Sequence, residues 1–408
     1  MHTLRIFVRG IFKASSKGCS VGQHYSSSAK PSLNMNHALV VSKLSRYEFE
    51  QYRNPNLSED QLEALLRKRG SDFDIVIKHH RLHKDFEKKI ENALERSGIE
   101  TKVVNRFTYT EESIEWADVI IVAGGDGTFL LAASRIAGNA KPVIGFNSDP
   151  SRSEGHLCLP KKYSENYLEA IEKLKKGEFN WKFRSRIRIT LCGNDIFYPP
   201  VELHEQELLE PQHRYFDCIT EQQKIEAAHS VSQANVRVLP VLALNEVFIG
   251  ENLSARVSYF ELNVDGKIRS KVKSSGLCIC TGTGSTSWHT SINQITHQTV
   301  AEIANLLGKT LDASEAHRIT KCFNDCLVFS PEDKRMYYTI RDLISTDVWP
   351  NPKGIEPRGY ASYIQVKSRC IDAGLVIDGG ISFHFNDGSV AILEIHDSDA
   401  LRTVSLIE

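Results

Sequence analysis

The ten residues from Val119 to Thr128, VIIVAGGDGT, restrict the possible folds of this chain more than any other stretch. The first four are all β-branched, a pattern typical of a strand buried on both faces of a parallel sheet. Two glycines follow, and the apolar residues after Gly127 predict a helix with Thr128 as its N-cap. A glycine turn between a strand and a helix N-terminus is a place where phosphate binds.

Strands and helices alternate around this stretch. Short apolar runs predict strands, at residues 38–41, 103–104 and 142–146. Amphipathic runs predict helices, at residues 58–70, 84–96 and 165–176. The first of these helices has Ser58 and Gln61 as a capping box and ends at Gly70. Such alternation predicts a doubly wound parallel sheet, here an α/β domain over residues 36–180.

From about residue 181 the chain consists of short strand-like runs broken by glycine, asparagine and aspartate. The stretches NVDGK and FNDGS have the turn chemistry of β-hairpins. We therefore expect a β-rich C-terminal domain over residues 181–395. Helical or irregular insertions are predicted near residues 202–232 and 290–350, and residues 396–408 are expected to form a C-terminal tail.

The first 30 residues are basic and rich in serine, and the first acidic residue of the chain is Glu48. Apolar residues between Leu4 and Phe12 fall largely on one face of a helix, with basic residues beside it. This composition is typical of a mitochondrial transit peptide, which we expect within residues 1–35 and which implies import into the mitochondrial matrix. A disordered basic tail is the alternative.

Composition argues against several kinds of partner. A net charge of −1 gives no support to nucleic-acid binding, and no apolar run approaches the roughly 18 residues of a membrane span. Nine scattered cysteines, an odd number, indicate a reducing compartment. Cys322 and Cys326 lack a second ligand pair for zinc, and His79, His80 and His83 are expected on the solvated face of a charged helix. No metal site is predicted from these residues.

Asp126 is unusual in a loop that suits phosphate, because like charges repel. The loop contains no lysine, so it is not a Walker A loop, and G-x-G-x-x-G spacing is also absent. A carboxylate held over a sugar can accept the proton of a hydroxyl, whose oxygen then attacks phosphorus. Asp126 is therefore a candidate general base, with a cap on the following helix as the alternative.

Two further stretches carry polar groups at strand-like positions. Asn245 and Glu246 stand between apolar runs, where an amide and a carboxylate must be hydrogen-bonded or functional. They are able to bind a ribose diol or a carboxamide, and a turn or strand end is the alternative. The stretch TGTGSTSW at residues 281–288 offers small hydroxyls and backbone N–H groups as a neutral ligand cradle, unless it is a plain loop.

Together, GGDGT, NE and TGTGSTSW resemble the motifs of the NAD kinases, whose usual third motif is T-P-T-G-S-T-A-Y. Gly282, Ser287 and Trp288 stand in place of the proline, alanine and tyrosine. The stretches GFNSDPSRSEGHL and KSSGLCICTGTGS are most similar to the mitochondrial branch of that family. The resemblance covers about residues 115–160, 240–290 and 370–395, and it implies an NAD kinase/diacylglycerol kinase-like fold.

The resemblance implies ATP-dependent phosphorylation of the adenosine-ribose 2′-hydroxyl of NAD to give NADP, with Asp126 as the base at that hydroxyl. NAD and ATP would be the substrates, with Mg²⁺ arriving on ATP. Asn245 and Glu246 would hold the ribose or adenine side of the dinucleotide. The residues expected to bind substrate are Gly124, Gly125, Gly127, Thr128, Asn147, Asn245, Glu246, Thr283, Gly284, Ser285, Thr286, Ser287 and Ser291.

One position departs from the family pattern. Many relatives have G-D-G-L before the third motif, whereas this chain has Ser275 where the aspartate is expected. We predict a compensating acid in the inserted loop, either Asp149 or Glu154. His156 in the same loop is a further candidate for contact with phosphate.

Two alternatives remain open at this point. Lipid kinases of the diacylglycerol or sphingosine type also carry a GGDGT loop, but NE and TGTGST favour a dinucleotide. A non-catalytic NAD-binding sensor would share the fold, and the intact Asp126 argues against it. The apolar face of the insertion at residues 290–350 needs a partner, which favours a homodimer, although it is also able to cover the β-rich domain.

Overall fold

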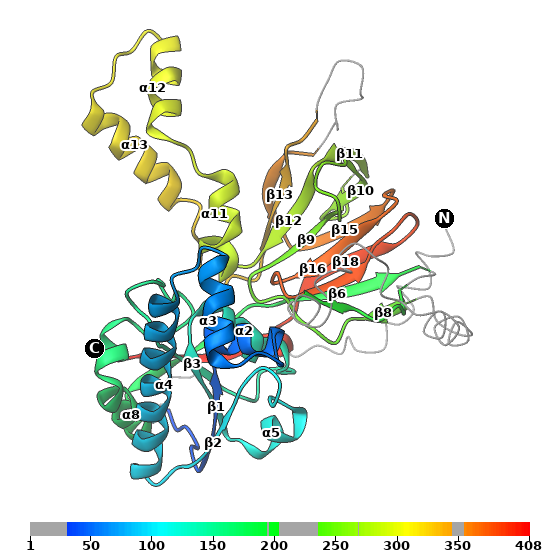
Figure 1. Cartoon of the computed structure of the whole chain (residues 1–408). Helices are drawn as coiled ribbons and strands as arrows, with labels where there is room; N and C mark the ends of the chain where they lie inside the picture. Colours follow the sequence, from blue (N-terminus) through cyan, green and yellow to red (C-terminus); the bar gives the residue numbers. More distant parts are fainter. Residues whose placement is uncertain (1–30, 194–195, 204–235, 268, 345–354) are drawn as a thin grey trace.

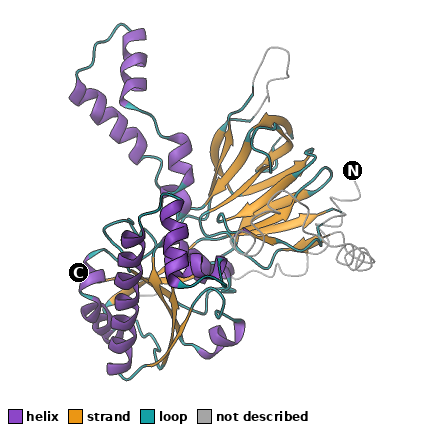
Figure 2. Ribbon diagram, viewed as in Figure 1, coloured by secondary structure: helices purple, strands orange, loops and turns teal. Residues whose placement is uncertain are grey.

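The computed structural model describes residues 31–193, 196–203, 236–267, 269–344 and 355–408, and it consists of an α/β part and a β-sandwich (Figures 1 and 2). The predicted transit peptide and nearly all of the insertion predicted near residues 202–232 lie outside the described residues. Across the described ranges, no helix combines the length and apolar character that a membrane crossing requires.

The α/β part is built on a parallel sheet with the strand order β2-β1-β3-β4. Its strands are β1 (His37–Ser42), β2 (Glu100–Val104), β3 (Val119–Gly124) and β4 (Val143–Asn147). Alternate residues of β1, β3 and β4 enter two separate apolar cores, because side chains of a strand point to opposite faces. The predicted doubly wound α/β architecture is confirmed.

Helices cover both faces of this sheet. One core contains residues of α4 (Phe73–Arg96) and α8 (Tyr167–Lys176), and the other contains residues of α5 (Glu111–Trp116) and α6 (Asp126–Ser134). Because β1 lies between β2 and β3, the direction of winding changes between β1 and β3. The crevice beyond the carboxyl ends of two such strands is where ligands bind in open α/β sheets.

Helix boundaries confirm some predictions and correct others. Helix α3 (Glu59–Lys68) has the predicted capping box of Ser58 and Gln61. The remaining short helices of this part are α2 (Arg46–Arg53) and α7 (Lys162–Glu165). Helix α4 begins at Phe73 rather than near residue 84, because Asp72 caps it. Helix α6 begins at Asp126 with Gly125 as N-cap, so the prediction of Thr128 as the N-cap was wrong.

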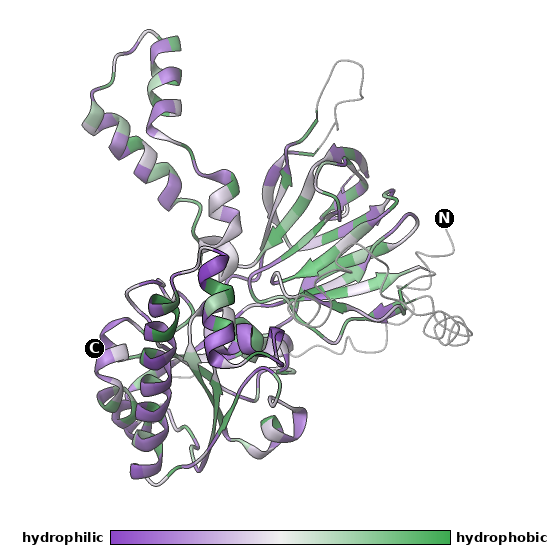
Figure 3. Cartoon of the chain, viewed as in Figure 1, coloured by the Kyte–Doolittle hydropathy of each residue, from purple (hydrophilic) through white to green (hydrophobic). Residues whose placement is uncertain are grey.

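The β-rich part is a sandwich of two antiparallel sheets around one apolar core. One sheet has the order β11-β10-β15-β18-β6-β8, and the other has the order β14-β13-β12-β9-β16-β17-β7. The strands are β6 (Ile187–Cys192), β7 (Val201–Glu202), β8 (Val236–Val238), β9 (Glu246–Glu251), β10 (Ser258–Val264), β11 (Ser270–Ser274), β12 (Gly276–Cys280), β13 (Met336–Arg341), β14 (Arg358–Ala361), β15 (Tyr363–Ser368), β16 (Ala373–Ile377), β17 (Ile381–His384) and β18 (Val390–Ile395). Figure 3 shows these strands as largely apolar, while α4 is mainly hydrophilic on its visible face.

Two details of the predicted β-rich domain were wrong. The NVDGK turn does join a hairpin, β10 to β11, but the FNDGS turn joins β17 to β18, which belong to different sheets. The predicted insertion at residues 290–350 contains strand β13, which pairs with β12 and β14 inside the second sheet. Met336, Tyr338 and Ile340 alternate into the core there.

Residues 288–325 form a helical arm. It contains α11 (Trp288–Asn293), α12 (His297–Leu306) and α13 (Ala313–Asp325), and α12 and α13 project away from both parts of the molecule (Figure 1). Leu306 and Leu307 at the end of α12 are 88% and 71% exposed. The arm therefore presents apolar surface to solvent.

The last residues of the chain return to the α/β part and are not a free tail. Residues 401–406 form β19 (Leu401–Leu406), which pairs antiparallel with β5 (Phe179–Arg184). Phe179 and Leu406 enter the same apolar core as α4 and α8. The C-terminal strand therefore belongs structurally with the α/β part.

Candidate functional site

The NE pair and the TGTGSTSW stretch lie against each other. Thr281 donates a backbone hydrogen bond of 3.0 Å to the carbonyl oxygen of Asn245, and its hydroxyl donates one of 2.5 Å to Leu244. A Cβ on Gly284 would lie only 2.1 Å from the carbonyl oxygen of Asn245. Only glycine permits this approach, so two predicted binding stretches that are distant in sequence form one surface.

Asp126 is the first residue of α6, at the carboxyl end of β3. Its carboxylate accepts hydrogen bonds from the backbone N–H groups of His156, at 3.1 Å, and Leu157, at 2.9 Å. It makes no capping bond to its own helix, so the alternative reading of Asp126 as a helix cap was wrong. Two backbone donors hold the carboxylate in one orientation.

The loop after β4 supplies these donors, and Asn147 shapes it. The amide of Asn147 donates to the carbonyl oxygen of Ser153 at 3.0 Å and accepts from the backbone of Asp149 at 3.0 Å. Asn147 is 2% exposed. The described contacts therefore give Asn147 a part in building the loop that holds Asp126, while its contact with substrate stays a prediction.

Asn245 and Glu246 stand at the beginning of β9, not in the middle of a strand. The Asp378 carboxylate accepts hydrogen bonds from the backbone N–H groups of Leu244, Asn245 and Glu246, at 2.8, 2.8 and 3.0 Å. Asp378 has a positive φ of 48° in the turn between β16 and β17, where aspartate is tolerated better than most residues. Sequence reasoning missed Asp378, whose only local signal is its place before Gly379 in a tight turn.

The side chains of the NE pair are left with open acceptors. Asn245 Oδ1 and Glu246 Oε2 are buried, and no described residue is a hydrogen-bond partner for either atom. Burial, and next the charge of Asp378, raise the pKa of Glu246 to about 8, and a hydrogen bond with Ser287 acts in the opposite direction. Burial also raises the pKa of Asp378 to about 6. Buried acceptors without partners are costly, which suits a site that is completed by ligand hydroxyl or amino groups.

The TGTGSTSW stretch contains both internal and accessible groups. Ser285 is fully buried; its hydroxyl donates to the carbonyl oxygen of Gly282 at 2.7 Å and accepts from Phe329 N–H at 3.2 Å. Thr286 and Ser287 are half-buried, and Ser291 is exposed on α11. The hydrogen bonds of Ser285 fold the loop, and its contact with substrate stays a prediction.

The structure explains why Gly282 replaces the usual proline. The position of a Cβ on Gly282 would lie 1.8 Å from the carbonyl oxygen of Ser330. The segment that leads from the helical arm to β13 therefore fills the space that a proline at position 282 would need.

The acid beside Ser275 is Asp342, which the sequence reasoning did not identify. Ser275 Oγ donates to Asp342 Oδ2 at 2.7 Å, just beyond the end of β13. Asp149 instead contacts His79 at 3.2 Å, and Glu154 contacts Lys161 at 3.1 Å. Neither predicted acid lies at Ser275 by these contacts, whereas Asp342, which follows β13, places a carboxylate beside Ser275.

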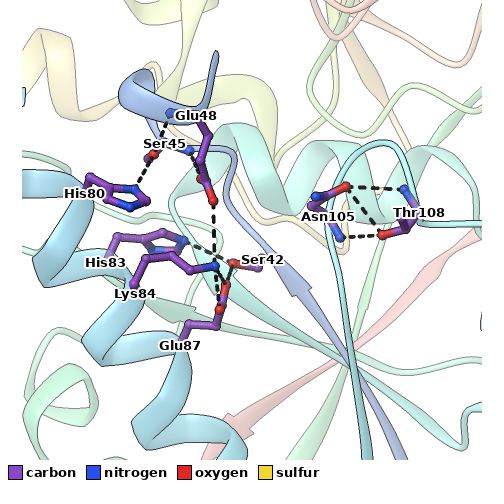
Figure 4. A network of polar contacts seen from close by, with 9 residues as sticks. All are labelled: Ser42, Ser45, Glu48, His80, His83, Lys84, Glu87, Asn105 and Thr108. Atoms are coloured by element: carbon purple, nitrogen blue, oxygen red, sulfur yellow. Dashed lines mark hydrogen bonds and ion pairs between the residues drawn. The ribbon is translucent and has the colours of Figure 1, made fainter. Parts of the chain in front are cut away.

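The three histidines of α4 do not share a solvated face, so that prediction was wrong. Figure 4 shows His83 beside Ser42 and Glu87 at the carboxyl end of β1, and His83 is only 4% exposed. Ser42 Oγ lies 3.0 Å from His83 Nε2 and donates to Glu87, so His83 is the donor to Ser42. Burial lowers the pKa of His83 to about 4. Because α4 begins at Phe73, His83 follows the buried Val76 on the inner face of the helix.

His79 and His80 have their own partners. His80 Nδ1 lies 2.8 Å from Ser45 Oγ (Figure 4), and His79 contacts Asp149 in the loop that holds Asp126. Among the residues that the structure describes, no group of three or more histidine, cysteine, aspartate or glutamate side chains is placed to bind a metal. These histidines connect α4 to the ends of β1 and β4.

The structure thus combines an α/β part that carries Asp126 with a β-sandwich that carries the NE pair and the TGTGSTSW stretch. Residues 31–179 match the family model described as ATP-NAD kinase N-terminal domain. The chain is 44% identical to NAD kinase 2, mitochondrial, of Xenopus tropicalis over 391 residues, which covers 90% of each chain. It is 45% identical to the human protein of that name, covering 90% of this chain and 84% of the relative. The chain belongs to the NAD kinase family, in its mitochondrial branch.

A solved structure supports the same fold. The crystal structure of yeast NADH kinase complexed with NADH has a TM-score of 0.51 and 12% sequence identity, and the match covers 91% of this chain and 83% of that chain. At this identity the likeness shows the shared fold. The comparisons support neither the lipid kinase nor the non-catalytic sensor.

Replacing His83 with glutamine is expected to make the folding stability fall less when the pH is lowered. In the wild type the unfolded histidine takes up a proton near pH 6.5. Folded His83 stays unprotonated down to about pH 4, and its charged neighbours are Glu87, Glu48, Lys43 and Lys84. Stability therefore falls as pH drops from 6.5 to 4, by roughly 2–3 kcal/mol from this group.

Urea unfolding of both proteins between pH 7.5 and 5 measures the effect. The exposed His317→Gln variant is the control and should follow the wild type. An H83Q curve parallel to that of the wild type would contradict the assignment.

Alanine substitutions at two glycines distinguish a role in packing from a role in contact with substrate. Gly284→Ala should lower the melting temperature strongly, because the new methyl group meets backbone. Gly127→Ala should not, because no atom lies within 4 Å of its added Cβ. If substrate occupies that space, G127A will lose NADP formation while keeping its melting temperature. Unchanged KM values for NAD and ATP in G127A would remove Gly127 from the binding residues.

Proposed function

We propose that Asp126 accepts the proton of the adenosine-ribose 2′-hydroxyl of NAD while a phosphoryl group passes to that oxygen from ATP. The chain is an ATP-dependent NAD kinase, and the observation that carries the proposal is the carboxylate of Asp126, fixed by two backbone N–H groups at the switch point of the sheet. The new bond joins the ribose oxygen to phosphorus. The bond from phosphorus to the β-phosphate oxygen breaks, and ADP leaves.

The NE pair and the TGTGSTSW stretch are proposed to bind the dinucleotide. The open acceptors of Asn245 and Glu246 suit the donors of a ribose or an adenine. Thr283, Thr286, Ser287 and Ser291 line the adjoining stretch, and Ser287 already hydrogen-bonds Glu246.

The phosphoryl donor is proposed to bind at the N-terminal end of α6. Gly124, Gly125, Gly127 and Thr128 surround the first turn of this helix, whose free N–H groups and dipole favour phosphate. We expect Mg²⁺ to arrive with ATP as part of the substrate, because neutralising the charge of a triphosphate is the usual way this chemistry proceeds.

The matrix is the proposed site of action within the mitochondrion. Close relatives carry the name mitochondrial, and the basic, serine-rich residues 1–30 suit a cleaved import signal.

Asp126→Asn is expected to lower kcat for NADP formation by about 10²–10⁴-fold, because the amide cannot accept the proton. NAD binding, measured by calorimetry, should stay within a few-fold of the wild type. Asp149→Asn, a carboxylate of the adjoining loop, is the matched control and should keep its activity. A D126N enzyme within tenfold of wild-type kcat would contradict the role of base.

The helical arm is proposed to bind a second copy of the chain. Ile303, Leu306 and Leu307 are exposed on α12, and the arm stands clear of both parts of the molecule (Figure 1). The double variant Leu306→Asp/Leu307→Asp should therefore convert a dimer into a monomer in sedimentation experiments. Lys321→Glu on α13 is the control that should stay dimeric. A monomeric wild type, or a dimeric double variant, would contradict this interface.

A further inference from the structure

Arg184, the last residue of β5, and Arg186, in the link from β5 to β6, are both buried, and they differ in one respect. Arg186 donates to the backbone carbonyl oxygens of four residues, which satisfies its guanidinium: Asp399, Ala133, Ile136 and Gly138. Arg184 is 8% exposed, and within the described residues its guanidinium makes a single hydrogen bond, a long one of 3.4 Å from Nη1 to Thr283 Oγ1. No partner for its buried Nε lies among those residues.

Arg184 is also without an ion pair. Within the described residues no carboxylate oxygen lies within 4.0 Å of its guanidinium nitrogens, although Asp126 and Glu332 act on it electrostatically from further away. A buried cation that lacks a close anion is costly to fold. The cost is removed if an anion binds beside it during function.

The location of Arg184 restricts which anion this is. Its guanidinium touches Thr283 of the TGTGSTSW stretch. The charge of Asp126 also acts on this guanidinium and on the half-buried thiol of Cys158, which lies 3.7 Å from the carbonyl oxygen of Gly124 in the glycine loop. Arg184 therefore touches the loop proposed to bind the dinucleotide and lies within electrostatic range of the proposed base.

We propose that Arg184 is a catalytic residue, whose guanidinium binds the oxygens of the phosphoryl group during its transfer to the ribose hydroxyl. The transferring group spreads negative charge over three oxygens, and a planar guanidinium with several N–H donors binds such oxygens in pairs. Arg184 gives up no proton in this step: Asp126 takes the hydroxyl proton, and ADP leaves with the electron pair of the broken bond. This role rests on the proposed function, in which Asp126 is the base and the TGTGSTSW stretch binds the dinucleotide.

The C-terminal strand positions this arginine. Arg184 is the last residue of β5 and pairs with Leu401 at the start of β19. Leu401 is fully buried in the core that also contains Phe129 of α6. The backbone of Arg184 is therefore fixed relative to the helix that carries Asp126.

The test compares Arg184→Lys and Arg184→Ala with Arg402→Lys. Arg402 lies on β19, has a buried Nε without a partner like Arg184, and stacks on Trp181 with its guanidinium carbon 3.7 Å from the ring centroid. We expect R184K to lower kcat at least about 10²-fold, because an ammonium cannot bind two oxygens in a plane. KM for NAD should change by less than about threefold, and R402K should keep wild-type kinetics.

Two further measurements exclude a structural role. Melting temperature and NAD binding by calorimetry show whether each variant is folded, and added guanidinium chloride at low concentration should restore part of the activity of R184A. Restored activity supports contact with the phosphoryl group. The proposal is overturned if R184K keeps kcat within tenfold of the wild type, if only KM for NAD rises, or if folded R184A is not restored by guanidinium. An inactive wild type would instead contradict the kinase activity itself.

Discussion

The position of Asp126, the proposed base, depends on one buried guanidinium. Arg186, at the entry to the β-sandwich, donates to the carbonyl oxygens of Ala133, Ile136 and Gly138 at 3.2, 2.7 and 2.8 Å, at and just beyond the C-terminal end of α6. Carbonyl groups at a helix C-terminus have no partner within the helix, and a cation is favourable there. Because Asp126 is the first residue of that same helix, this side chain of the sandwich fixes where the carboxylate stands. The two parts of the molecule are therefore joined at the end of α6 opposite to the chemistry.

Asp378 has the complementary role on the other side of the site. Its carboxylate accepts from three consecutive N–H groups at the start of β9, and its charge interacts favourably with Arg186. Thus one buried cation satisfies carbonyl groups behind the catalytic helix, and one buried anion satisfies N–H groups behind the NE pair. Both charges are used to hold backbone, which leaves the side chains of Asn245 and Glu246 free to face a ligand. In contrast, Arg184 holds almost no backbone or side chain, which is why its charge is available.

The sequence is sufficient to predict elements whose signal is local. The β-branched run of β3 and the capping box of α3 depend on neighbouring residues, and both are confirmed. Contacts between residues that are far apart in the sequence cannot be predicted from such local patterns. Asp378 and Leu244 are 134 residues apart, and Ser275 and Asp342 are 67 apart, so no spacing rule connects them. The FNDGS turn shows the same limit, because identical turn chemistry serves a hairpin or a crossing between sheets. His83 was misplaced because the polar residues of α4 concealed the true start of the helix.

The charges at the site also bear on the release of product. The Asp126 carboxylate is held by two backbone N–H groups, so it cannot rotate away from a group placed on the ribose oxygen without losing both. In the proposed mechanism, this oxygen carries a hydroxyl before transfer, which the carboxylate attracts. After transfer it carries a phosphate, and once Asp126 has returned its proton to solvent the two anions repel each other. The same rigid placement that favours proton transfer therefore disfavours retention of NADP. A base on a mobile side chain would gain little such discrimination, because it would turn away from the phosphate.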